Sequence, residues 1–392
     1  YLSKPWNFNI NQKNNFIQAI SDLIIRALQE NEGSILAFLP GAGEIKQLQA
    51  FLKPKLPNDL DIRPLYGAMS FDEQQKAILP SQRRKLILAT SIAETSLTIK
   101  DIRIVIDGGL TRRSRFDPSS GMSRLITEKV TKAEATQRMG RAGRTNTGVC
   151  YKLWTKGEEG GLTPFPEPEI LISDLSPLAM ELAAWGVNNP ENLPFLTHPK
   201  SSDFLTAQEL LKNLGAINYK GKITELGQKI SREPTHPRLA RILISGGLDA
   251  NLVVALIESK DILGSNAPTD FKLRVDAIKN PISLGNDNPF TINKKASSNV
   301  LKLSKRLHSK GQIELSYSQM AALAYPDRIG LSRNQNRGQF LLSGGKGAFI
   351  SASDPLASAK MIVAINLDGN KTESKLRIGI ELLETEFMEL FH

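Results

Sequence analysis

Cysteine and histidine are both scarce in this chain of 392 residues. Cys150 is the only cysteine, which excludes an internal disulfide, and the four histidines have no metal-ligand spacing. No apolar run approaches the roughly 18 residues that span a bilayer, and the first residues lack the order of basic, apolar and small side chains typical of a signal peptide. We therefore expect a cytoplasmic protein with no metal site of its own and no membrane partner.

Acidic residues are outnumbered as well. The chain has 50 lysines and arginines against 40 aspartates and glutamates, a formal net charge of +10. Such an excess suits a polyanionic partner, although a solvated basic surface gives the same count. The arginines gather in one stretch, at Arg112, Arg113, Arg115, Arg124, Arg138, Arg141 and Arg144. This clustering favours nucleic acid as the partner.

Low-complexity tracts are absent, and 40% hydrophobic with 23% charged residues is typical of folded proteins. A single core does not usually grow to this length, so the sequence predicts a multidomain protein. Because the chain begins with Tyr1 instead of Met, we interpret it as a piece of a longer protein. Residues 1–15 would then be a linker from an upstream domain.

Short apolar runs alternate with helix-like segments over residues 16–162. The runs lie at 35–39, 62–66, 86–90 and 102–106. This alternation is typical of an α/β domain with a parallel sheet. Ligands of such sheets lie beyond the carboxyl ends of the strands, so we expect the loops that begin at Pro40, Gly67 and Thr90 to carry function.

The pattern changes where prolines stand at positions 164, 166 and 168. Amphipathic helices and a small hairpin at 217–223 predict a winged helix over residues 163–235. Helical patterns dominate residues 236–323, which predicts a helical bundle. Short β-prone runs between turn residues predict a β-rich region over residues 324–392, with a partial small barrel that is incomplete.

Residues 137–144 read Gln-Arg-Met-Gly-Arg-Ala-Gly-Arg. On one continuous helix, Gln137, Arg141 and Arg144 have the spacing i, i+4 and i+7, so they share a face. Two guanidinium groups and an amide suit the transition state of phosphoryl transfer. The alternative is an ordinary basic helix, but two glycines in one exposed turn would cost it roughly 1 kcal/mol each.

Residues 137–144 resemble motif VI of the DEAH group of superfamily 2 helicases. Residues 89–99 resemble its motif V, and residues 37–41 and 65–70 resemble motifs IV and IVa. The resemblance spans nearly the whole chain, is strongest before Tyr151, and toward the C-terminus is greatest to the bacterial HrpB branch. It implies that residues 16–162 form a second RecA-like domain and that the final β-rich region is OB-like.

The resemblance also implies roles in ATP binding. Gln137, Arg141 and Arg144 would be the catalytic group, with the two arginines acting as fingers toward ATP phosphates. Ser96 would sense the γ-phosphate, and Thr98 and Asp101 would complete the ATP-sensing residues. The acidic residue that often follows motif V directly is displaced here, because Lys100 comes before Asp101.

For RNA, the resemblance implies backbone contacts by the loops after the strands. The implied RNA-binding residues are Gly41, Gly67, Thr90, Ser91, Arg112 and Arg113. Two β-prone runs flank the turn at 117–121, and the hairpin that they predict would be the family's strand-separating hairpin. A plain surface hairpin is the alternative.

No Gly-x-x-x-x-Gly-Lys-Ser/Thr phosphate loop and no DEAH box occur in the sequence. ATP and Mg²⁺ would therefore be held mainly by a missing N-terminal RecA-like domain in cis. We expect the chain to be the C-terminal half of an ATP-dependent RNA helicase that translocates 3′ to 5′ on RNA. The chain alone should be inactive. RNA is the expected partner, and the sequence does not identify a protein activator. The alternatives are a non-catalytic RNA-binding or regulatory protein that retains this domain, and a DNA helicase.

Overall fold

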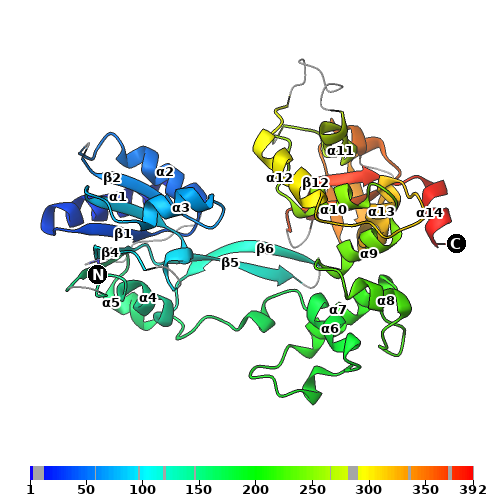
Figure 1. The fold of residues 1–392 in the computed structure, drawn as a ribbon, viewed down its shortest axis with the longest axis horizontal. Coiled ribbons are helices and arrows are strands. Elements are labelled where there is room, and N and C mark those ends of the chain that lie inside the picture. Colours follow the sequence, from blue (N-terminus) through cyan, green and yellow to red (C-terminus); the bar gives the residue numbers. More distant parts are fainter. Residues whose placement is uncertain are drawn as a thin grey trace. The chain divides into compact units, whose positions relative to one another are not determined.

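The computed structural model describes residues 1–2, 13–57, 59–95, 98–117, 121–144, 147–264, 266–280, 290–333, 337–369 and 373–391. These residues form two compact units (Figure 1). Unit 1 comprises Tyr1–Ser114 and Leu125–Pro168, and unit 2 comprises Arg115–Arg124 and Glu169–His392. The boundary near residue 168 lies at the last of the three prolines, a few residues beyond the predicted position.

Unit 1 contains a five-stranded parallel sheet with the strand order β2-β3-β1-β4-β7. The strands are β1 (Ser34–Phe38), β2 (Asp61–Leu65), β3 (Lys85–Ala89), β4 (Ile102–Asp107) and β7 (Val149–Lys152). All five residues of β1 and of β3 are buried, as strands covered on both faces require. The predicted parallel α/β sheet is confirmed.

Helices cover both faces of this sheet. They are α1 (Lys13–Glu30), α2 (Ala42–Leu52), α3 (Phe71–Ile78) and α4 (Lys132–Met139), and the unit also has a short, mostly exposed helix α5 (Lys156–Gly160) and a 3₁₀ turn η1 (Ser91–Ala93). Successive residues of β1 belong to two different hydrophobic clusters, Ile35 to one and Leu36 to the other, because side chains alternate across a strand. Helix α1 begins at Lys13, so the prediction that the linker reaches residue 15 was wrong.

A two-stranded ribbon belongs partly to unit 1 and partly to unit 2. It consists of β5 (Leu110–Asp117) and β6 (Met122–Lys129), and residues 118–120 at its turn lie outside the described residues. Its base belongs to unit 1 and its tip to unit 2. The predicted hairpin is confirmed.

Unit 2 begins with short helices around a core of its own. They are η2 (Glu169–Leu171), α6 (Ser176–Ala184), η3 (Pro190–Asn192), α7 (Ser201–Asn213) and α8 (Glu225–Ile230). Ile217 and Ile223 pair antiparallel, and Gly221 has a φ of 77° in the tight turn between them. Thr224 caps α8 by accepting a hydrogen bond from the N–H of Gly227. The predicted small hairpin and following helix are present.

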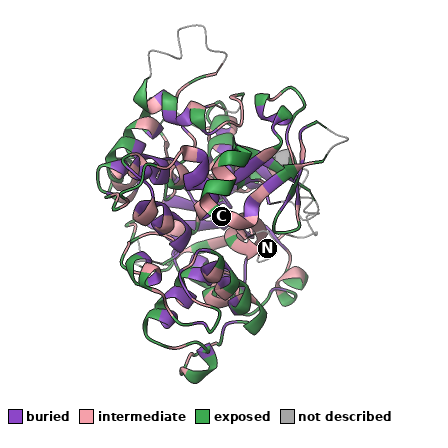
Figure 2. Cartoon of the chain, turned by 90° about the vertical axis from the view of Figure 1, so that its right-hand side faces the viewer, coloured by how far each residue is buried: buried purple, intermediate pink, exposed green. Residues whose placement is uncertain are grey.

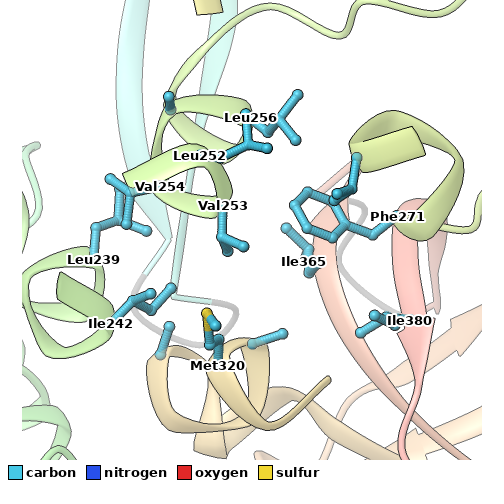
Figure 3. Packing of buried hydrophobic residues seen from close by; sticks show 14 of the residues in the cluster. Leu239, Ile242, Leu252, Val253, Val254, Leu256, Phe271, Met320, Ile365 and Ile380 are labelled. Carbon is cyan, nitrogen blue, oxygen red and sulfur yellow. The ribbon is translucent and has the colours of Figure 1, made fainter. Parts of the chain in front are cut away.

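The next helices share their core with the barrel that follows. They are α9 (Pro237–Ser245), α10 (Ala250–Glu258), α11 (Lys272–Lys279), α12 (Lys294–Ser304) and α13 (Tyr317–Ala324). Figure 3 shows Leu239 and Val253 from the helices facing Ile365 and Ile380 from the barrel strands. The predicted boundary at residue 323 therefore separates two kinds of element and not two cores.

The last elements form a closed five-stranded barrel in the order β10-β12-β11-β8-β9. They are η4 (Pro326–Arg328), β8 (Ile329–Ser332), β9 (Gln339–Leu342), β10 (Gly347–Phe349), η5 (Pro355–Ser358), β11 (Met361–Leu367), β12 (Glu373–Glu381) and α14 (Glu384–Phe391). The prediction of a partial, incomplete barrel was wrong, because β8 and β12 were overlooked and β12 pairs with both β10 and β11.

Buried residues lie on the strands and the inward faces of the helices, with exposed residues outside them (Figure 2). Among the described residues, no helix combines the length and apolar character needed to cross a membrane. Within the same residues, no three histidine, cysteine or acidic side chains come together as metal ligands would. Burial raises the pKa of the Cys150 thiol to about 12, so this thiol stays protonated and unreactive at neutral pH.

Candidate nucleotide and RNA site

Helix α4 carries the first part of the motif VI sequence and is fixed at its N-terminus. Thr131 and Glu134 form a capping box, in which the Glu134 N–H donates to Thr131 Oγ1 (3.3 Å) and the Thr131 N–H donates to Glu134 Oε2 (2.8 Å). Arg113 of β5 forms ion pairs with Glu134 and with Glu128 of β6. Helix α4 is thereby joined to the base of the ribbon.

The helix does not continue through the motif. It ends at Met139, with Gly140 as its C-cap, and single turns follow in which the N–H of Arg141 donates to the carbonyl of Arg138 (3.0 Å). The prediction that Gln137, Arg141 and Arg144 share one face of a continuous helix was therefore wrong. Glycine weakens helix propensity by about 1 kcal/mol relative to alanine, and this motif has two glycines within four residues.

Arg138 anchors the motif from inside the unit. Its side chain is only 1% exposed, and its guanidinium binds Glu94 (Nε to Oε1, 2.6 Å) and Asp107 (Nη1 to Oδ1, 2.8 Å). Burial opposes the charge of Arg138, but Asp107 and Glu94 raise its pKa overall. Burial also raises the pKa of the Glu94 carboxyl, against the opposing effect of Arg138. This triad fixes motif VI to motif V and to the end of β4.

Arg141 and Arg144 both contact the motif V loop. Arg141 is buried and donates to the carbonyl oxygen of Glu94. Its pKa is lowered by burial and then by the charge of Arg144, so the two guanidinium groups lie near enough to repel each other. Arg144 is exposed, and its Nη1 donates to Thr98 Oγ1 (2.8 Å).

The other residues predicted to contact ATP are only partly brought together. The Gln137 side chain is exposed on α4, one position before the anchored Arg138. Asp101 is exposed and adopts a φ of +67°, and its carbonyl accepts from the Ser34 N–H at the start of β1 (3.2 Å). Ser96 lies outside the described residues.

Three of the predicted RNA loops meet at one edge of the sheet. Strands β1, β2 and β3 end side by side, with Ala89 paired to both Phe38 and Leu65. The loops with Gly41, Gly67 and Thr90–Ser91 follow directly at this edge, because the strands are parallel. Ser91 is exposed, and a Cβ at Gly67 would meet no atom within 4 Å. This edge is open to a ligand.

Arg112 approaches the same edge from the ribbon. Its Nη2 pairs with Glu44 Oε1 in the first turn of α2 (3.1 Å), and its Nε donates to Thr127 Oγ1 (3.3 Å). A Cβ at Gly41 would lie 2.3 Å from Arg112 Nη1, so a larger residue there would displace this guanidinium. Arg113 is held by two carboxylates, and its RNA contact stays a prediction.

The chain matches models of helicase domains and sequences of known helicases. Residues 15–146 match the helicase conserved C-terminal domain, and residues 207–232 match the winged-helix helicase associated domain (HA2). The ATP-dependent RNA helicase HrpB of Escherichia coli is 37% identical over 377 residues, which cover 94% of this chain and 44% of HrpB. The ATP-dependent RNA helicase HrpA of the same organism is 35% identical over 58% of this chain and 18% of HrpA.

Solved structures agree with these matches. A crystal structure of the E. coli DExH-box NTPase HrpB aligns over 100% of this chain and 46% of that protein, with a TM-score of 0.78 and 34% identity. The chain is therefore similar to the part of the HrpB-type helicases that carries the helicase conserved C-terminal domain and HA2. The chain spans less than half the length of these relatives.

Sequence reasoning missed the buried anchor of motif VI. Arg138 was grouped with the basic residues, and Glu94 and Asp107 were given no role. One signal was available, since Asp107 directly follows the apolar run of β4 and a carboxylate at a buried strand end needs a partner.

Proposed function

We propose that the full-length protein is an ATP-dependent RNA helicase that couples ATP hydrolysis to 3′ to 5′ movement on RNA in the cytoplasm. In this proposal unit 1 is its second RecA-like domain. Residues 169–235 act as a winged helix, residues 236–323 as a helical bundle and residues 324–392 as an OB-like barrel. ATP and Mg²⁺ are held mainly by an N-terminal RecA-like domain that precedes this chain.

The proposal is carried by the pair of guanidinium groups at motif VI. Arg141 donates to the Glu94 carbonyl and Arg144 to the Thr98 hydroxyl, and the charge of Arg144 contributes to lowering the pKa of Arg141, so two like charges lie close together. A polyanion placed between them relieves that repulsion, which is the electrostatic requirement of a γ-phosphate during transfer. Gln137 on the exposed face of α4 would orient the attacking water. When Arg144 turns to the phosphate, its hydrogen bond to Thr98 would break, and the Thr98 hydroxyl would bond to water or to the nucleotide.

The RNA path follows from the open edge of the sheet. Small residues at Gly67, Thr90 and Ser91 permit close approach of a phosphate backbone, and ligands of parallel sheets lie beyond the carboxyl ends of the strands. Arg112 adds a cation beside this edge, although Glu44 neutralises part of its charge. Backbone contacts of this kind bind RNA without reading its sequence.

The direct test is ATP hydrolysis by the full-length protein without nucleic acid, with a single-stranded RNA, and with DNA of the same sequence. We expect RNA to raise kcat and DNA to do so much less. Equal stimulation by DNA would identify a DNA helicase. Absence of hydrolysis under every condition would contradict the motor and favour a non-catalytic RNA-binding protein.

A further inference from the structure

Helix α9 lies between two hydrophobic cores of unit 2. Leu239, Ile242 and Leu243 belong to the core shared with the barrel, and Figure 3 shows the first two facing it. Ala240 belongs to the core of the preceding short helices. The face that remains carries Arg238, Arg241 and Ser245, with the spacing i, i+3 and i+7.

The two arginines of this face have different partners. Arg238 holds Asp327 through two hydrogen bonds (2.5 and 2.8 Å) and donates to the carbonyl of Ala324 (2.9 Å). Arg241 is half-buried, and its Nη1 donates to Ser245 Oγ (2.6 Å). Within the described residues, this neutral hydroxyl is the sole hydrogen-bond partner of Arg241, and no ion pair reaches it.

Arg241 is an exception among the arginines that unit 1 and unit 2 withdraw from water. Within the described residues, the buried and half-buried arginines that bind carboxylates or backbone carbonyls are Arg63, Arg84, Arg112, Arg113, Arg124, Arg138, Arg141, Arg238, Arg274 and Arg328. Proteins generally pair a cation that they take out of water, because desolvation without an opposite charge is unfavourable. Burial lowers the pKa of Arg241, as expected for a guanidinium that has no ion pair among the described residues.

We propose that Arg241 and Ser245 form a binding site for a phosphodiester group of the RNA backbone. A guanidinium has five N–H donors, and one is used here, so several remain for phosphate oxygens. Ser245 accepts from Arg241, which leaves its own O–H to donate to the same anion. The helicase assignment supplies RNA as the ligand, and the site itself rests on the unpaired charge.

This site makes a prediction about stability that a structural arginine does not. Because Arg241 pays a desolvation cost without a partner, removing its charge should leave the RNA-free protein as stable or more stable. A structural arginine behaves in the opposite way, since its loss leaves its partners unpaired. Stability and RNA binding therefore separate the two roles.

The experiment measures binding of a fluorescein-labelled single-stranded oligouridylate to the full-length protein by anisotropy, across a series of KCl concentrations. Arg241→Gln should weaken binding several-fold and reduce the salt slope by about 0.7, the value for one phosphate contact on a single strand. Its Tm without RNA should be unchanged or higher. Arg241→Lys, which keeps the charge, should retain most of the slope.

Arg232→Gln is the matched control, because Arg232 is exposed in the same unit and its loss changes the net charge equally. It should leave the slope nearly unchanged. If both glutamine variants reduced the salt slope of RNA affinity equally, the effect would come from net charge alone, and the proposed site would be wrong. A lower Tm for Arg241→Gln with unchanged RNA binding would overturn it in favour of a structural role.

Inorganic phosphate is a separate arm of the same experiment. Phosphate that raises the Tm of the wild-type protein but not of Arg241→Gln supports the anion contact, and RNA must then compete with it. Phosphate stabilisation that RNA cannot displace would contradict a site for the RNA backbone. The site is independent of ATP chemistry, so it can hold even where hydrolysis is not stimulated by RNA.

Discussion

Arg144→Ala in the full-length protein is expected to lower kcat for RNA-stimulated ATP hydrolysis by about 10³-fold or more, the usual contribution of an arginine finger. Arg144 is exposed and donates a hydrogen bond to Thr98 on the loop surface, so its loss should not disturb the fold. RNA affinity and Tm should remain at wild-type values. Steady-state hydrolysis and thermal melting measure the two effects separately.

Arg83→Ala provides the control for this prediction. Arg83 is also exposed, but it precedes β3, whereas motif V follows the other end of that strand. Its replacement should leave kcat unchanged. Arg141→Ala is a less clean test, because Arg141 is buried against the Glu94 carbonyl and its loss would combine catalytic with structural effects. Wild-type turnover in Arg144→Ala would remove Arg144 from the chemistry.

Arg138→Ala is expected to destabilise unit 1 by about 3–5 kcal/mol, because it leaves two buried carboxylates without their cation. Glu94 and Asp107 are 9% and 0% exposed in their side chains, so water cannot replace the guanidinium. Among the described residues, Asp107 Oδ2 already has no hydrogen-bond partner, so no other group can replace Arg138 there. Urea unfolding of the 392-residue chain, followed by circular dichroism, measures the loss.

The pH dependence of this variant provides a second readout. Burial raises the pKa of Glu94 in the folded protein, and loss of Arg138 removes the cation that opposed this rise. A carboxyl with a raised folded pKa binds its proton more tightly when folded, so its contribution to stability falls as pH rises through that range. The destabilisation by Arg138→Ala should therefore be smaller near pH 5 than near pH 8. A loss no larger than that of Arg83→Ala would show that the triad is unimportant.

The buried sheet of unit 1 could be predicted because its signal is local. Strands β1 and β3 are continuous apolar runs, and the predicted bounds 35–39 and 86–90 differ from the observed ones by one residue. Strand β12 was missed because its buried residues alternate with Lys375 and Arg377, and Gly379 interrupts the β-prone pattern. Its pairing with two partners closes the barrel, and such long-range pairing cannot be read from a short window.

The roles of the site residues stay predictions, and the geometry predicted for three of them was wrong. The resemblance assigned Arg141, Arg144 and Thr98 to ATP, and both arginines do contact the loop that holds Thr98. The prediction that these residues share one helix through residues 137–144 was wrong. The helix ends at Met139, and contacts of Arg138 and Arg141 with Glu94 hold the turns that follow. Burial of Arg138 could not be inferred from its type, since arginine is rarely buried without a partner and the partners lie over 30 residues away.

The central claim is that motif VI acts on the transferring phosphate of ATP. Aluminium fluoride bound with ADP mimics this phosphate in the transition state. The most direct test measures the affinity of this complex for the full-length protein and for its Arg144→Ala variant, both in the presence of RNA. The account predicts that the variant binds ADP normally and binds the mimic about 10²-fold more weakly or worse. Equal affinity of both proteins for the mimic would contradict it.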